Sequence, residues 1–166
     1  MIQRIQTVYL FAIIILALIT CSGQIIDFQD RIPGQTETQG TAIAYQLNAV
    51  FFNTYQNGSL VNSEIQYGLI ILVSLIVGWT LNIILKFKNR KRQLLLTKIN
   101  FIIIGSYLAA VLAKAFTQIP NFTFANMTLK ASIGLALIFF MLYLNLRALL
   151  LIRKDEELVK SVDRLR

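Results

Sequence analysis

The chain has 166 residues, of which 56% are hydrophobic and 14% are charged, against about a quarter charged in an ordinary soluble domain. This composition indicates an integral membrane protein, and the net charge of +8 lies in short runs between apolar segments, which argues against nucleic-acid binding. A single cysteine, Cys21, and the absence of histidine exclude disulfide frameworks, Cys/His zinc sites and histidine-based triads, and we expect no cofactor.

Four apolar stretches are long enough to cross a bilayer, which takes about 20 residues at about 1.5 Å of rise per residue. They are residues 5–22, 65–85, 99–116 and 129–152. The connections between them are too short for a second domain. Residues 1–166 therefore predict one all-α membrane domain, a bundle of four transmembrane helices.

The first stretch follows Arg4 and ends in LITCSG, which is similar to a secretory signal or to a lipoprotein signal lipidated at Cys21. A lipidation signal normally has Gly, Ala or Ser before the cysteine, whereas Thr20 stands there. An uncleaved first span is also needed to place both ends of a four-span chain on one side. We expect a retained signal anchor, with Cys21 as a small apolar residue.

Residues 23–64 form a polar segment of about forty residues, close to the lower limit for an independent core. Ile43, Tyr45 and Leu47 alternate with smaller or polar residues as in a strand, and Asn57-Gly58 is typical of a hairpin turn. A helix is the alternative, because one helical face would be lined by Ile43, Leu47, Val50, Phe51 and Tyr55. We favour a small β-hairpin, whose unpaired edge would accept a strand from another chain.

The connection over residues 86–98, KFKNRKRQLLLTK, is predicted to be a turn and carries six cations and no acid. A basic cluster beside a span attracts anionic lipid headgroups, at about 1 kcal/mol per residue near the surface. The candidate lipid contacts are Lys86, Lys88, Arg90, Lys91 and Arg92. The alternative is that the cluster only fixes the membrane topology.

Small side chains recur at four-residue spacing on three of the spans, which places them on one face of each helix. They are Ser74 and Gly78, then Gly105, Ala109 and Ala113, then Ser132 and Ala136. We expect these faces to pack against helices of the same bundle, and the alternative is contact with another protein or with a second copy of the chain.

Ionisable and amide side chains lie near the ends of the spans, so neither an ion path nor a proton relay is predicted. Glu64, Lys114 and Lys130 fall at the outer boundary, where the glutamate would pair with either lysine. We interpret this group as structural, with binding of a solute or a lipid headgroup as the alternative. Asn100 and Asn145, near the inner boundary, are expected to snorkel to the interface.

The chain closes with the charged segment IRKDEELVKSVDRLR. Opposite charges stand at i,i+4 spacing in two pairs, Arg153 with Glu157 and Glu156 with Lys160. Such pairs add about 0.2 to 0.5 kcal/mol each to a helix, so the last span is predicted to continue as a helical tail over residues 153–166. Its apolar stripe is Leu151, Leu158, Val162 and Leu165. The stripe predicts either a docking element for a partner or a cap over the bundle itself.

Positive charge predicts the orientation, because translocated loops are depleted in Lys and Arg. With both termini in the cytoplasm, all of the sixteen Lys and Arg residues except Arg31, Lys114 and Lys130 lie on the cytoplasmic side. We therefore expect both termini, the basic turn and the tail to be cytoplasmic.

Three segments carry a resemblance to a known family: MIQRIQTVYL at the start, KNRKRQLLLTKIN before the third span, and IRKDEELVKSVDRLR at the end. In these segments the chain resembles domain-of-unknown-function family 4293, small four-span inner-membrane proteins of the Bacteroidetes lineage. The resemblance implies an inner-membrane location, an uncleaved first span and a periplasmic segment over residues 23–64. It carries over neither an activity nor catalytic residues.

These observations favour a non-enzymatic inner-membrane protein, an accessory or scaffolding subunit that contacts membrane lipids and a membrane-protein partner in a larger envelope complex. The alternative is a small transporter or lipid-binding protein that uses the outer charged group. No catalytic constellation supports an enzyme.

Overall fold

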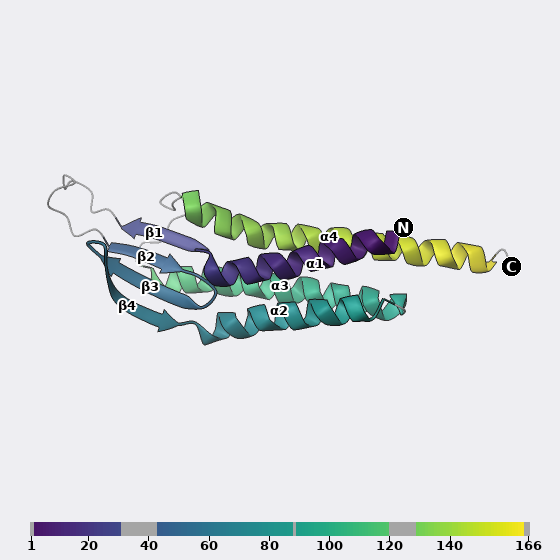
Figure 1. Ribbon diagram of the computed structural model, residues 1–166, viewed down its shortest axis with the longest axis horizontal. Coiled ribbons are helices and arrows are strands. Elements are labelled where there is room, and N and C mark those ends of the chain that lie inside the picture. The colour runs from purple at the N-terminus through teal and green to yellow at the C-terminus, as the bar shows by residue number, and fades with distance from the viewer. Residues whose placement is uncertain (1, 31–42, 88, 120–128, 165–166) are drawn as a thin grey trace.

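The computed structural model describes residues 2–30, 43–87, 89–119 and 129–164 (Figure 1). Four helices run side by side: α1 (Ile2–Ser22), α2 (Tyr67–Leu85), α3 (Arg90–Gln118) and α4 (Leu129–Arg164). Each is long and apolar enough to cross a membrane, which confirms the four predicted spans. A four-stranded sheet lies at one end of the bundle, the sheet end, and the last turns of α4 extend from the other, the tail end.

The helices contact one another in a ring, α1 with α2, α2 with α3, α3 with α4, and α4 with α1. Buried apolar side chains from every helix fill its centre, among them Ile13, Ile76, Ile104 and Ile138. The outer surface is also apolar, with large exposed side chains such as Ile71, Ile102 and Phe139. A helix that is apolar all round is expected where its outer face meets lipid.

The sheet comprises β1 (Ile26–Asp30), β2 (Ile43–Leu47), β3 (Phe51–Gln56) and β4 (Ser59–Ile65), antiparallel and in the order β1-β2-β3-β4. Asn57 and Gly58 join β3 to β4 with φ of 52° and 79°, the positive values that a two-residue hairpin turn requires. The predicted hairpin is therefore confirmed, and the alternative of a helix over this segment is wrong. The sheet is larger than expected, because β1 and β2 extend the hairpin on one side.

The sheet packs on the bundle through shared backbone and core contacts. Ala49 N donates to Thr20 O at 3.1 Å, and Gln66 N donates to Val50 O at 2.8 Å. The start of α4 lies against β1, where Gly134 allows a close approach. A Cβ atom at Gly134 would collide with the carbonyl oxygen of Gln24 and lie 2.6 Å from Cα of Ile25. Sheet and bundle therefore share one core.

The basic segment differs from the prediction of a turn over residues 86–98. Helix α3 begins at Arg90, so that only residues 86–89 connect it to α2. The Asn89 side chain accepts a hydrogen bond from Arg92 N at 3.3 Å, the usual role of an asparagine at a helix start. Arg, Lys, Gln and Leu are good helix formers, and the helix therefore starts before its apolar part.

Helix α4 continues past the predicted end of its span at residue 152 and ends at Arg164, as the charge pattern predicted. Figure 1 shows these last turns extending straight away from the other helices. They do not fold back over the tail end of the bundle, so the described part of the tail does not form the alternative cap.

Candidate functional site

Asp155 at the base of the tail is attached to the first residue of α3. Arg90 Nε lies 3.4 Å from Asp155 Oδ2, and Arg90 Nη1 donates to the backbone oxygen of Asp155 at 3.1 Å. The two side chains are only 28% and 15% exposed. Within the tail, Arg153 Nε lies 3.1 Å from Glu157 Oε1, the predicted i,i+4 pair. The tail therefore leaves the bundle in a direction fixed by α3.

Because of this contact, Arg90 has a different role from the other candidate lipid contacts. Lys86, Lys91 and Arg92 are exposed at the tail end, whereas Lys88 lies outside the described residues. These exposed cations remain the candidate contacts for anionic headgroups. Arg90 instead holds two helices together.

The predicted stripe on the tail is described in part. Leu151 is half-buried and Leu158 is 47% exposed, next to Val159 at 41%, while the side chain of Val162 and the whole of Leu165 lie outside the described residues. The apolar core ends at Ile152. Beyond that point Leu158 and Val159 are exposed apolar side chains of the tail.

We expect the Arg90–Asp155 pair to show a measurable coupling. Asp155→Asn and Arg90→Gln should each lower the free energy of unfolding in mixed detergent micelles. The decrease in the double variant should be smaller than the sum of the two single decreases. A coupling of about 1 kcal/mol is expected for a partly exposed pair. Arg153 and Glu157 provide the control, since their side chains are 68% and 63% exposed and should couple less. Equal coupling in the two pairs would contradict a special role for Arg90.

Buried polar side chains connect α2, α3 and α4 near the tail end. Asn100 Nδ2 donates to Asn145 Oδ1 at 3.0 Å and lies 3.2 Å from Thr80 Oγ1. Asn145 Nδ2 donates to the backbone oxygen of Thr97 at 3.1 Å. Thr80, Asn100 and Asn145 are completely buried. The prediction that the two asparagines snorkel is therefore wrong, because each amide has a partner inside the bundle.

Two of the three predicted outer charges, Glu64 and Lys114, lie on the same side of the molecule at the sheet end. Glu64 Oε2 on β4 accepts from Gln118 Nε2 at 3.5 Å, and Gln118 is one turn from Lys114 on α3. Lys130 is on α4, which packs against β1 at the opposite edge of the sheet, and its side chain lies outside the described residues. Glu64 and Lys114 therefore remain as the candidate group at the sheet end.

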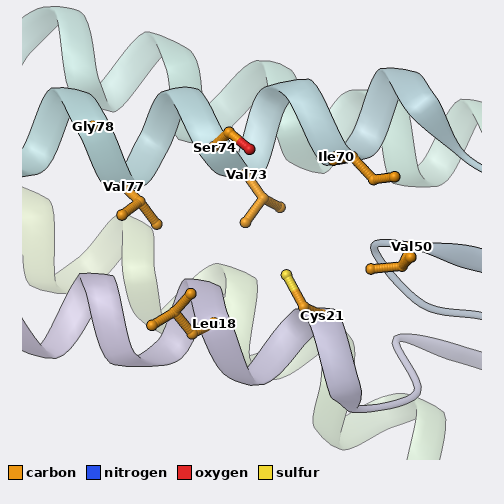
Figure 2. A pocket seen from close by; sticks show the side chains of 8 residues that line it. All are labelled: Leu18, Cys21, Val50, Ile70, Val73, Ser74, Val77 and Gly78. Carbon is orange, nitrogen blue, oxygen red and sulfur yellow. The ribbon is translucent and has the colours of Figure 1, made fainter.

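Two apolar grooves of similar volume flank α2 at the sheet end. The first, about 360 Å³, lies between α1 and α2; Figure 2 shows Leu18 and Cys21 of α1 facing Val73 and Val77 of α2. The second, about 370 Å³, lies between α2 and α3. Its lining residues are Gly68, Leu69, Leu72, Ala110, Ala113, Lys114 and Thr117. Among the residues that the structure describes, Lys114 is the only charged one that lines either groove.

The small-residue faces lie mostly on the surface of the bundle. Ser74 and Gly78 are exposed beside the first groove, and Ala109 and Ala113 are exposed on α3, with Gly105 half-buried. A Cβ atom at Gly78 or at Gly105 would meet no atom within 4 Å. These residues are therefore open to lipid or to a neighbouring helix rather than enclosed between helices of the bundle.

Four apolar helices around a shared core, with an apolar outer surface, define a multi-pass membrane protein. The chain belongs to the family described as domain of unknown function DUF4293, which matches residues 2–165 and confirms the resemblance of the three segments. A comparison with curated proteins gives no match. Among the described residues, no three His, Cys, Asp or Glu side chains gather as metal ligands would.

Proposed function

We propose that the protein is a non-enzymatic accessory or scaffolding subunit of a larger complex in the bacterial inner membrane, and that its tail docks to a partner in the cytoplasm. The observation that carries the proposal is the straight course of α4 beyond the core, with its base attached to Arg90 and its apolar side chains exposed. A helix that presents Leu158 and Val159 to water gains by burying them in a groove of another protein.

The proposed orientation, with both termini in the cytoplasm, is supported by where the charges lie along the helices. Lys86, Lys91 and Arg92 stand at the tail end, and Arg153 and Lys154 stand on α4 next to Asp155, which contacts Arg90 there. Cytoplasmic loops carry such an excess of positive charge. In this orientation the sheet is periplasmic.

The proposal predicts a stoichiometric partner whose capture depends on the tail. The protein would carry a tag at its N-terminus and be purified in mild detergent from native membranes, as the intact chain and as the Leu158→Asn/Val159→Asn variant. We expect the variant to lose the partner, because two polar side chains replace the apolar contact.

The matched control is Leu60→Asn/Val61→Asn, which changes the same two residue types on β4 at the other end of the molecule, where they are more exposed, at 56% and 61%. This control should keep the partner. Loss of the partner only in the control would move the interface to the edge of the sheet, and failure of the intact chain to capture any stoichiometric protein would overturn the proposal.

The second candidate is a small transporter or lipid-binding protein that uses the charged group at the sheet end. The observation in its favour is that Lys114 lines an apolar groove. It predicts that neutral residues at Glu64 and Lys114 abolish function while a scrambled tail is harmless, the reverse of the result expected for a docking subunit.

A further inference from the structure

The groove between α2 and α3 combines an apolar wall with one cation. Leu69 and Leu72 of α2 face Ala110 and Ala113 of α3, whose small side chains leave the space open. Gly68, Ala113 and Thr117 are exposed, so the groove opens on the outer surface of the bundle. In a membrane this surface faces acyl chains.

Lys114 lines this groove with no carboxylate of the described residues within ion-pair distance. A lysine near the end of a span is stabilised when its ammonium reaches a counter-charge at the interface. Lipid phosphate is the counter-charge that a membrane supplies at this depth.

Glu64 contacts α3 one turn beyond this cation. Its carboxylate contacts Gln118 Nε2 at 3.5 Å and Asn62 Nδ2 at 3.2 Å. Residues 114 and 118 are four apart in α3 and share one face of the helix. A cation and an anion thus flank the same face without forming an ion pair with each other.

We propose that this groove binds a phospholipid with a zwitterionic headgroup, its acyl chain between α2 and α3 and its phosphate at Lys114. Glu64 selects the headgroup, because its carboxylate attracts an amine next to the phosphate and repels a headgroup with net negative charge. The inference deepens the second candidate function and is independent of docking by the tail.

The groove between α1 and α2 serves as an internal comparison. It has nearly the same volume and flanks the same helix, but none of the described residues that line it is charged (Figure 2). Acyl chains entering it meet no side chain that distinguishes headgroups. Selectivity is therefore expected only at the groove that contains Lys114.

Native mass spectrometry of the full chain, released from detergent containing equal amounts of phosphatidylethanolamine and phosphatidylglycerol, tests the proposal. We expect one retained lipid, preferentially the ethanolamine lipid. Lys114→Met should weaken its retention about tenfold, the size of one charge-assisted hydrogen bond, and Lys114→Arg should restore it. Glu64→Gln should shift the preference toward phosphatidylglycerol.

One further variant of the site and two controls separate its effect from general effects. Ala113→Phe fills the proposed groove and should lose the lipid, whereas Ser74→Phe, which fills the other groove, should keep it. Lys98→Met removes an exposed cation elsewhere on α3 and should behave like the unchanged protein. Equal losses in Lys114→Met and Lys98→Met, or unchanged headgroup preference in Glu64→Gln, would overturn the proposal, whatever the outcome of the partner capture.

Discussion

Replacement of Gly134 by alanine is expected to destabilise the protein by about 3 kcal/mol, although alanine is the better helix former. The added Cβ would collide with the carbonyl oxygen of Gln24 and lie 2.6 Å from Cα of Ile25. Both are backbone atoms, so neither can rotate away as a flexible side chain would. Relief requires α4 to move off the segment that leads into β1, which would disturb the contact between sheet and bundle. Unfolding in mixed detergent micelles measures the loss.

Gly105→Ala is the matched control for this prediction, since it is also a glycine within a long helix. A Cβ atom at Gly105 would meet no atom within 4 Å. The substitution should therefore stabilise the protein by about 0.5 to 1 kcal/mol through the lower entropy of the unfolded chain. The two substitutions make the same chemical change, but their effects on the free energy of unfolding should have opposite signs. Stabilisation by both would show that α4 does not approach residues 24–25 closely.

Local sequence patterns predicted the features that depend on neighbouring residues. The length of the apolar runs predicted four helices, Asn57-Gly58 predicted the hairpin, and i,i+4 charges such as Arg153 and Glu157 predicted the helical tail. The rest of the sheet gave a weaker signal. The β4 sequence, SLVNSEI, does not alternate apolar and polar residues, the pattern that marks a half-buried strand. This agrees with the structure, in which every residue of β4 is exposed. In β1, the alternation of Ile26 and Phe28 with polar residues was the signal that could have found it.

Contacts between residues far apart in the chain were not predictable in the same way. Arg90 and Asp155 are separated by 65 positions, and neither segment shows which opposite charge it will meet. A charge count treats Arg90 as one more cation for the membrane surface, yet its guanidinium binds the tail. The same limit applies to the asparagines, because hydropathy records that an amide lies inside a span but does not identify its partner.

The buried amides provide the second large effect. Asn100→Leu should destabilise the protein by about 2 kcal/mol, because it leaves Asn145 Oδ1 without its donor in the interior of the bundle. Asn145→Leu should have a similar effect, since it removes that acceptor and the donor to Thr97 O. Unfolding in mixed detergent micelles measures both variants and the double variant on one scale.

The double variant distinguishes a specific amide pair from simple loss of packing. With both asparagines replaced by leucine, neither amide remains unpaired, so the total loss should be smaller than the sum of the single losses by about 1 kcal/mol. Replacement of the exposed and charged Arg147 by leucine, two residues from Asn145 on α4, controls for added hydrophobicity near the tail end. Strict additivity of the two asparagine variants would contradict a direct bond between them, because independent sites do not relieve each other. A coupling of the expected size would instead show that the amide pair holds α3 against α4, the two helices that Arg90 and Asp155 also join at the base of the tail.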